Sequence, residues 1–398
     1  MAQGDNLYDI GRQSGVADLV IVGGGIMGLW AALRGCRRGL SVTLVERDTI
    51  GAGASGGLLG ALMPHTPDRW SPKKQLQFEA LLSLEGEIAR LEDETGLRAG
   101  YRRAGRLIPL PKPHLAAMAR GHEHDAAVAW KAGDRQFHWQ YREPGYRSGL
   151  INPEATLAGC VEEDFAARVS PRGLTALLDA ALARQPGFTL LRDADVTEID
   201  ARAGQVRLAR GGAIPFGHLI LAAGTGTERL LQSLAGPLPR PVVVPVKGQA
   251  ALLKADLPPE TPVIYLDGLY VVPHEGGQVA IGSTSEIRFS EPFSTDGQLD
   301  ALIAAARNLV PALAEAPVLE RWAGLRPKAI GRDPMVGRLP GPARVSVLTG
   351  GFKVSFGLAH RLAEALIDAI VSGRESCDLP ESFSPAAHLK DAARAPGG

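Results

Sequence analysis

The chain opens with short apolar runs separated by a glycine turn, a pattern that predicts parallel β-strands joined by a helix. An apolar run from Asp18 to Val22 ends in three glycines, and a segment with helical apolar spacing follows from Leu29 to Arg38. A second apolar run, Ser41–Val45, ends on Glu46. The order strand, glycine turn, helix, strand and acid is typical of the dinucleotide-binding βαβ unit. The sequence therefore predicts a nucleotide cofactor at the start of the chain.

Each residue type in this unit has a physical role. Gly23 permits the tight turn, Gly25 lets a pyrophosphate approach the backbone at a helix N-terminus, and Gly28 lets the helix lie close to the strand. Glu46 can accept hydrogen bonds from a ribose diol. The alternative is a glycine-rich turn with no cofactor, but the two strands and the acid in register favour a dinucleotide.

Further apolar runs place similar strands in the middle and at the end of the chain. His218–Gly224 and Val345–Gly351 each end in a glycine turn, and the second leads into a helix from about Leu358 to Val371. Other helices are predicted at Gln75–Leu91, Leu174–Leu182 and Leu299–Leu309. Strands are predicted at 189–191 and 195–199. The spacing of the β-type runs Val242–Val246, Ala250–Leu253, Val263–Leu266, Leu269–Val272 and Val279–Thr284 indicates an antiparallel sheet.

These runs predict one nucleotide-binding domain assembled from discontinuous segments, with a second domain threaded through it. The first domain would comprise residues 18–100, 152–240 and 328–385. The second, substrate-binding domain would comprise residues 101–151 and 241–327. Residues 1–17 would form a flexible extension, and residues 386–398 would form a tail.

Composition narrows the class of protein. At 398 residues the chain exceeds one ordinary core. Lys plus Arg and Asp plus Glu each number 43, so no net charge would attract nucleic acid or anionic lipid. The three cysteines, Cys36, Cys160 and Cys377, are too far apart to predict a disulfide framework or a metal site. With no apolar run long enough for a membrane span and no secretory signal, we expect a cytoplasmic protein.

Five blocks of the sequence resemble the FAD-dependent D-amino-acid oxidase superfamily, in particular its glycine oxidase and sarcosine oxidase branch. They are Val20–Arg47, the glycine-rich loop Gly51–His65, Leu219–Gly224, Pro245–Gln249 and a C-terminal series. That series consists of Tyr270–Pro273, Gly324–Pro327 with Pro334–Gly337, and Thr349–Lys353.

The resemblance implies an α/β protein with a discontinuous Rossmann-like FAD-binding domain (GR2-type) and a second, α+β substrate domain built on an antiparallel sheet. It also implies FAD, non-covalent here because the chain has no cysteine near Leu325. Adenine would stack near Val196, and the isoalloxazine would lie against the Gly51–His65 loop. The expected cofactor-binding residues are Gly23, Gly25, Ile26, Met27, Gly28, Glu46, Arg47, Ala54, Ser55, Gly60, Ala61, Leu62, Val196, Ala223, Gly224, Gly350, Gly351, Phe352, Lys353 and Val354.

The resemblance further implies that Arg326, Tyr270 and Lys353 act on the substrate. Arg326 matches an arginine that clamps the substrate carboxylate, and a planar guanidinium suits that bidentate contact. Tyr270 matches a tyrosine of the substrate pocket. Lys353 replaces an arginine of glycine oxidase. The implied reaction is hydride transfer from a neutral amine to flavin N5, which gives an imine that hydrolyses. No general base and no metal are needed.

Several positions depart from the family pattern or stay open. By position, Ser285 stands where sarcosine oxidase has a lysine that promotes reaction with oxygen, so the electron acceptor can be oxygen or another molecule. The segment after Phe352 also differs, which predicts a remodelled wall beside the substrate. His65, Lys247 and Gln249 are expected near the flavin or the substrate, although a structural role for His65 is an equal alternative.

Three other functions remain as alternatives. The protein could be the FAD subunit of a hetero-oligomeric amine or 2-hydroxy-acid dehydrogenase that passes electrons to a partner. It could act on a tRNA-linked amine, because the loop Gly53–Pro64 is similar to that of a tRNA-modifying oxidase and a cluster of arginines occurs at 98–106. A non-catalytic NAD-binding protein leaves the later glycine turns unexplained. We expect a small amine or amino-acid substrate, no nucleic acid partner and a homo- or hetero-oligomer.

Overall fold

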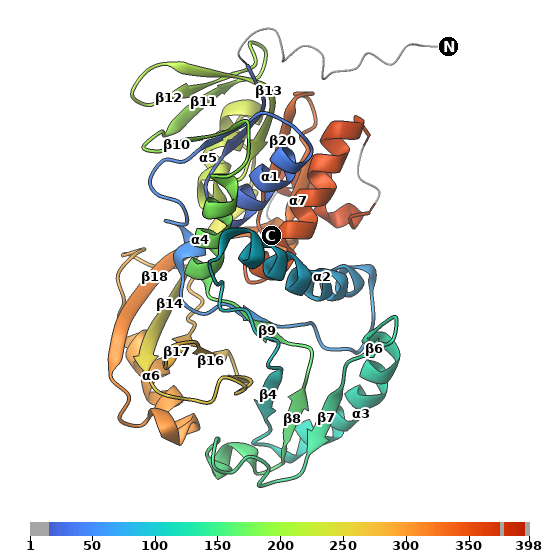
Figure 1. Cartoon of the computed structure of the whole chain (residues 1–398), viewed down its shortest axis with the longest axis vertical. Helices are drawn as coiled ribbons and strands as arrows, with labels where there is room; N and C mark the ends of the chain where they lie inside the picture. Colours follow the sequence, from blue (N-terminus) through green and yellow to red (C-terminus); the bar gives the residue numbers. More distant parts are fainter. Residues whose placement is uncertain (1–15, 375–377, 395–398) are drawn as a thin grey trace. The chain divides into compact units, whose positions relative to one another are not determined.

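The computed structural model describes residues 16–374 and 378–394 and divides the chain into two compact units. Unit 1 comprises Met1–Gly56, Thr175–Pro245 and Arg326–Gly398, and unit 2 comprises Gly57–Leu174 and Val246–Leu325. Most of the predicted N-terminal extension and Cys377 lie outside the described residues. Each unit is built on its own β-sheet (Figure 1).

The sheet of unit 1 has a parallel centre. β1 (Ala17–Val22) pairs in parallel with β2 (Val42–Val45) on one side and with β13 (Ala213–Leu221) on the other. β10 (Phe188–Leu191) extends the parallel part beyond β2, and β20 (Val345–Thr349) extends it beyond β13. Three strands add antiparallel edges: β19 (Met335–Arg338) on β20, and β11 (Val196–Asp200) with β12 (Gln205–Leu208) on β13. This is the predicted Rossmann-like arrangement.

Two long helices of unit 1 pack against each other. α1 (Ile26–Arg37) contacts α7 (Ser355–Ser372), and the rings of Trp30 and His360 lie 5.7 Å apart. Gly35 makes close packing on the sheet possible, because a Cβ there would lie 3.0 Å from the side chain of Leu19. The remaining helices with residues in this unit are α4 (Pro171–Leu182), α5 (Thr227–Ala235) and α8 (Pro385–Ala392).

The segment expected as a tail, 386–398, contains most of α8. Ser384 caps this helix by accepting a hydrogen bond from the Ala387 N–H at 3.2 Å. Pro385 at the first helical position favours the same start. Ala392 is fully buried and belongs to the core of unit 1, so the segment is integral to this unit.

Unit 2 is built on an eight-stranded sheet in the order β18-β14-β17-β16-β15-β4-β8-β7. The two predicted strands between Val242 and Leu253 form one continuous strand. The bounds are β4 (Arg106–Pro109), β7 (Trp139–Arg142), β8 (Cys160–Glu163), β14 (Val243–Lys254), β15 (Val263–Leu266), β16 (Leu269–His274), β17 (Gln278–Gly282) and β18 (Val318–Ala329). Two short pairs, β3 (Ala61–Leu62) with β9 (Ala167–Arg168) and β5 (Lys131–Ala132) with β6 (Arg135–Gln136), complete the unit's strands.

Different segments of unit 2 pack on the two faces of this sheet. α6 (Gly297–Leu309) packs on the face that carries Leu107, Ile264, Val271 and Ile281. The opposite face carries Val263 and Val272 and contacts Leu58, Leu59 and Met63 of the glycine-rich segment. α2 (Pro72–Thr95) and α3 (Pro113–Ala129) are the other helices of the unit, and α3 packs on β7.

The units differ from the predicted domains, because residues 57–100 and 152–174 belong to unit 2. An aromatic cluster explains the difference. The ring of Phe78 on α2 lies 4.7 Å from that of Phe165 and 6.2 Å from that of Phe137. In the sequence these aromatic residues lie far apart, so periodicity does not reveal that they share one core.

Gly105 supplies a test of how closely β4 approaches β8. Its φ is +74°, and a Cβ there would lie 2.2 Å from the carbonyl oxygen of Glu163. We expect Gly105→Ala to lower the thermal midpoint much more than Gly133→Ala. Gly133 also has a positive φ (+57°) but has nothing within 4 Å of its Cβ position, so it reports the cost of φ alone, about 1–2 kcal/mol. Equal losses in the two variants, measured by thermal denaturation, would contradict this account.

Candidate active site

Three glycine turns lie together at the carboxyl ends of neighbouring parallel strands in unit 1. Gly23 follows β1 with φ +112°, and a Cβ there would lie 2.5 Å from the Ala222 oxygen after β13. The Thr349 hydroxyl at the end of β20 donates to the Gly224 carbonyl at 3.3 Å. A Cβ on Gly351 would lie 2.6 Å from the end of Met27. In open α/β sheets this edge is where ligands bind.

The N-terminus of α1 is shaped for an anion. Gly25 is the N-cap and offers no side-chain cap, and the first turn of α1 has no acidic residue. The Ser55 hydroxyl accepts the Ile26 N–H at 2.9 Å. The Cβ position of Gly25 meets only that hydroxyl within 4 Å, at 3.3 Å. The partial positive charge of the helix end and the open backbone fit a pyrophosphate.

Glu46 lies beside this turn, at the end of β2. One of its carboxylate oxygens accepts the Gly24 N–H at 2.6 Å, and the other accepts the Asp48 N–H at 2.8 Å. These bonds hold the carboxylate next to the glycine turn, where a ribose of a dinucleotide would lie. The neighbouring Arg47 is exposed and pairs with Asp48 at 3.1 Å.

The other predicted cofactor residues fall in both units. Ala54 and Ser55 form a short 3-10 turn in unit 1, whereas Gly60, Ala61 and Leu62 lie in unit 2 around β3. A Cβ on Gly60 would lie 1.7 Å from the Val169 oxygen, which fixes the course of the loop. Val196 is 2% exposed, its side chain packs in the core of unit 1, and its carbonyl accepts a bond from Arg229.

A basic cluster lies at the third glycine turn. The Arg326 guanidinium carbon is 5.5 Å from the centre of the Phe352 ring, and the Lys353 ammonium is 5.8 Å from it. The Phe352 N–H donates to the Pro327 carbonyl at 3.1 Å, which joins the end of β18 to the turn. Partial burial and the charges of Arg326 and Arg332 lower the pKa of Lys353. The structure thus brings Arg326, Phe352 and Lys353 together.

Tyr270 belongs to unit 2. It is half-buried on β16, on the sheet face opposite α6, and its ring lies 4.9 Å from that of Tyr265 on β15. An aromatic side chain with a polar end suits a face that meets a small polar ligand.

Lys247 and Gln249 form a polar network within unit 2. The Lys247 ammonium lies 3.6 Å from Glu286 and 3.5 Å from Asp296, and Gln249 donates to both acids. Both side chains are almost fully buried, and the network ties β14 to the start of α6. The backbone N–H of His65 donates to Gln77 at 2.8 Å, and burial with the charges of Lys74 and Arg106 lowers the pKa of its imidazole. Ser285 is exposed after β17.

Comparison with known proteins identifies the family. Residues 18–365 match the family described as FAD dependent oxidoreductase (DAO). The chain belongs to this family. It is therefore an FAD-dependent oxidoreductase. The three glycine turns and the N-terminus of α1 in unit 1 fit this cofactor.

Individual relatives support the same assignment. The chain is 31% identical to a glycine oxidase of Pseudomonas aeruginosa over 386 residues, which cover 93% of this chain and 99% of the relative. It is 30% identical to the bifunctional protein ThiO/ThiG of Nostoc sp., covering 95% of this chain and 56% of that longer protein. Its fold matches the crystal structure of glycine oxidase from Geobacillus kaustophilus with a TM-score of 0.82 and 23% identity, covering 92% of this chain and 98% of that one.

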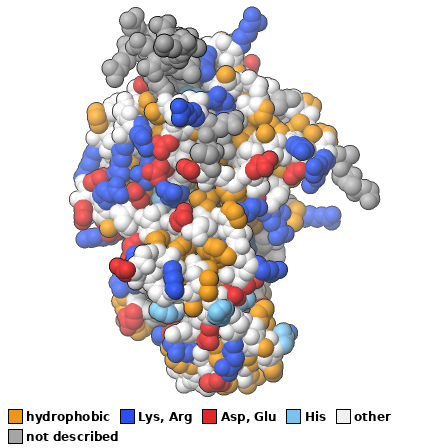
Figure 2. All heavy atoms as spheres, turned by 90° about the vertical axis from the view of Figure 1, so that its right-hand side faces the viewer, with side chains coloured by type: hydrophobic (Ala, Val, Ile, Leu, Met, Phe, Trp, Pro, Cys, Tyr) orange, Lys and Arg blue, Asp and Glu red, His pale blue; other side chains and the backbone are white. Residues whose placement is uncertain are grey.

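The arginine cluster at 98–106 is not a free basic surface. Each of its four arginines lies within ion-pair distance of a glutamate: Arg98 of Glu92, Arg102 of Glu275, Arg103 of Glu85, and Arg106 of Glu163. On the face drawn in Figure 2, acidic and basic side chains intermingle. In the sequence Arg106 belongs to this cluster of arginines, yet in the structure it is only 5% exposed. Within the described part of the chain, no helix is long and apolar enough to cross a membrane.

Gly25 offers a test of the pyrophosphate site, because a Cβ there would make one close contact with the protein, 3.3 Å from the Ser55 hydroxyl. We expect Gly25→Ala to weaken FAD binding by on the order of tenfold or more, because a methyl group would occupy the surface that a phosphate approaches. The matched control is Gly53→Ala, whose Cβ would meet nothing within 4 Å. Titration of each apoprotein with FAD, followed by flavin fluorescence, measures the difference. Unchanged FAD affinity in Gly25→Ala would place the pyrophosphate elsewhere.

Proposed function

We propose that the protein oxidises the C–N bond of a small amino acid or secondary amine, with a glycine-, sarcosine- or D-amino-acid-like substrate. The observation that carries the proposal is the basic cluster of Arg326 and Lys353 beside the glycine turn at 350–351. The guanidinium can bind a carboxylate in a bidentate manner, and the ammonium adds a second positive charge. The glycine oxidase names of the curated relatives agree with this substrate class.

Bound FAD would supply the acceptor for the hydride of the substrate Cα–H bond, and the imine product would be hydrolysed by water. In this proposal Arg326 and Lys353 bind and orient the substrate carboxylate, and Tyr270 donates a hydrogen bond to the carboxylate or the amine. The N-terminus of α1 and Glu46 hold the nucleotide half of the cofactor. The protein groups thus position the reactants and neutralise charge, without a general base.

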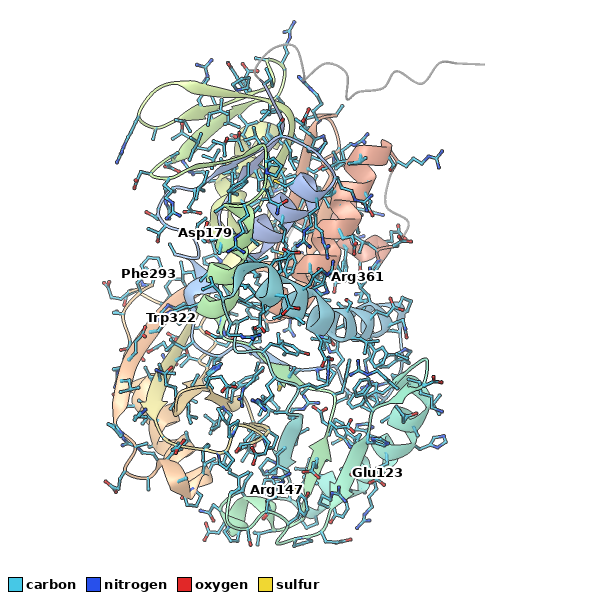
Figure 3. The ribbon with its side chains drawn as sticks, in the orientation of Figure 1. Glu123, Arg147, Asp179, Phe293, Trp322 and Arg361 are labelled. Carbon is cyan, nitrogen blue, oxygen red and sulfur yellow. The ribbon has the colours of Figure 1, made fainter. Side chains whose placement is uncertain are left out.

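Several finer points stay predictions. They are non-covalent attachment of FAD, a cytoplasmic location, oxygen or another molecule as electron acceptor, and the oligomeric state. One observation favours the alternative of a subunit that passes electrons to a partner: Ile287 and Phe293 are each 71% exposed, and Phe293 is labelled in Figure 3. Size-exclusion chromatography of the native protein separates a stand-alone enzyme from a complex.

Arg326 tests the carboxylate contact. We expect anaerobic addition of glycine, sarcosine or a D-amino acid to bleach the oxidised flavin band. Arg326→Met should raise the substrate dissociation constant roughly 10- to 100-fold, the size of a lost charge-assisted hydrogen bond, and Arg326→Lys should raise it less. An amine without a carboxylate serves as the control, because its binding should not change. Failure of every amino acid and N-methylated amine to bleach the flavin would contradict the proposal.

The lowered pKa of Lys353 predicts the pH dependence of carboxylate binding. Lys353 is charged below its pKa and loses its charge as the pH rises through it, so affinity for an anion falls on the alkaline side. Because the pKa is lowered, this fall should begin below the usual pH range of a lysine. Acetate, which has no amine to titrate, is the appropriate ligand, and flavin absorbance reports its binding. In Lys353→Arg this fall in affinity should move to higher pH. If it does not move, a group other than Lys353 causes the fall.

A further inference from the structure

Arg106 lies on the same sheet face as Tyr270. In the register of unit 2, Arg106 on β4 is beside Val263 on β15, and Tyr265, two residues further along β15, is beside Tyr270 on β16. Side chains two residues apart on a strand share a face, as do directly paired residues on neighbouring strands. This is the face opposite α6, and the segment that includes Met63 packs on it.

The Arg106 side chain is buried, but its hydrogen-bonding capacity is only partly used. Its Nε lies 3.0 Å from Oε1 of Glu163, and its Nη1 lies 3.7 Å from the Met63 sulfur. The guanidinium carbon is 5.7 Å from the centre of the Trp139 ring. Among the described residues, Nη2 has no hydrogen-bond partner. A buried donor of a charged group without a partner is costly, so a ligand acceptor there is favoured.

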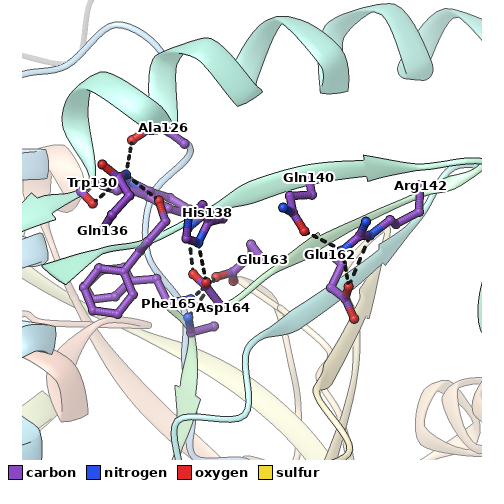
Figure 4. A network of polar contacts seen from close by, with 12 residues as sticks. Ala126, Trp130, Gln136, His138, Gln140, Arg142, Glu162, Glu163, Asp164 and Phe165 are labelled. Atoms are coloured by element: carbon purple, nitrogen blue, oxygen red, sulfur yellow. Dashed lines mark hydrogen bonds and ion pairs between the residues drawn. The ribbon is translucent and has the colours of Figure 1, made fainter.

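Glu163 does not satisfy this guanidinium. Its second oxygen, Oε2, is taken by the backbone N–H groups of Phe165 and Ala166 at 2.7 and 2.9 Å (Figure 4). Full burial raises the pKa of Glu163, because it disfavours the ionised form of the carboxyl group. Glu163 therefore positions Arg106 from one side, and Nη2 of the guanidinium has no acceptor within the described part of the chain.

A neighbouring arginine shows what a purely structural role looks like. Arg103, three residues earlier, donates to the carbonyl oxygens of Phe165 and Leu81 and pairs with Glu85. Its two terminal nitrogens are both used by the protein. Within the residues that the structure describes, the hydrogen-bond acceptor of Arg106 Nη1 is a thioether, and methionine is flexible enough to be displaced by a polar group.

We propose that Arg106 binds a second carboxylate of the substrate, on its side chain or its nitrogen substituent, so that the preferred amine carries two carboxylates. This inference rests on the proposed function, in which Tyr270 lines the substrate site. Tyr270 and Arg106 would then contact different parts of one substrate from the same sheet face. The planar guanidinium selects a carboxylate over an apolar group of similar size, because only the carboxylate satisfies the buried N–H donors.

The test compares matched substrates on the FAD-loaded protein. Sarcosine and N-(carboxymethyl)glycine differ by one carboxylate, as do D-alanine and D-aspartate, and anaerobic flavin reduction measures the affinity for each. We expect the wild-type protein to bind the dicarboxylates at least tenfold more tightly. In Arg106→Met this preference should fall by on the order of 10- to 100-fold, the size of a lost charge-assisted hydrogen bond.

Two further variants separate recognition from folding. Arg106→Met leaves Glu163 buried without its cation, so the double variant Arg106→Met with Glu163→Gln removes both charges together. Arg147→Met is the matched control, because Arg147 (Figure 3) pairs at 2.7 Å with Glu162, the residue before Glu163 on β8. This control should keep the wild-type preference. Calorimetric titration with glutarate and pentanoate, which cannot be oxidised, gives the same comparison without turnover.

The outcomes distinguish this inference from the proposed function. If no amine reduces the flavin, the proposed function fails. If sarcosine or D-alanine reduces it but the wild-type protein shows no preference for dicarboxylates, only the role of Arg106 is overturned. The role of Arg106 is also overturned if Arg106→Met and the double variant both keep the preference for dicarboxylates. If Arg106→Met does not fold, the double variant alone decides.

Discussion

The close approach of backbone to backbone at the carboxyl ends of β1, β13 and β20 is the constraint on which unit 1 depends. Any side chain at Gly23 would collide with the Ala222 carbonyl, and one at Gly28 would lie 1.9 Å from the Gly23 oxygen. Because these positions are glycines, α1 can begin directly behind the turn and present its N-terminus to a ligand. The same crowding brings Gly351 against Met27. The basic cluster of Arg326 and Lys353 is therefore fixed relative to the glycine turn after β1.

Much of this arrangement follows from local sequence. The strand at 18–22, the turn and Glu46 could be predicted because each depends on residues within about thirty positions and on a specific backbone conformation. The strands β14 to β17 of unit 2 were likewise evident from their β-type runs, whereas β4, β7, β8 and β18 of the same sheet were not predicted. The helix at 385–392 was not, since an eight-residue helix capped by Ser384 has too few turns to show a clear period.

The extent of unit 2 and the role of Arg106 depend on contacts that no local pattern encodes. Phe78, Phe137 and Phe165 come from three separate segments and form one aromatic cluster. Arg106 is four positions from Arg102, yet Arg102 is exposed and Arg106 is buried, because one lies before the turn at Gly105 and the other begins a central strand. In sequence both are members of one basic run. Only the register of β4 with β8 and β15 gives Arg106 its partner and its face.

The cationic side chains of the two units have different surroundings. In unit 1, partial burial and the nearby charges of Arg326 and Arg332 lower the pKa of Lys353, so like charges repel one another there. Binding a carboxylate relieves that repulsion, and it does so most where the charges are partly buried and poorly screened. In unit 2, Arg106 is balanced by Glu163 on one edge only. There an incoming carboxylate would satisfy donors rather than relieve repulsion, so its recognition should depend less on ionic strength than that of the carboxylate at Arg326.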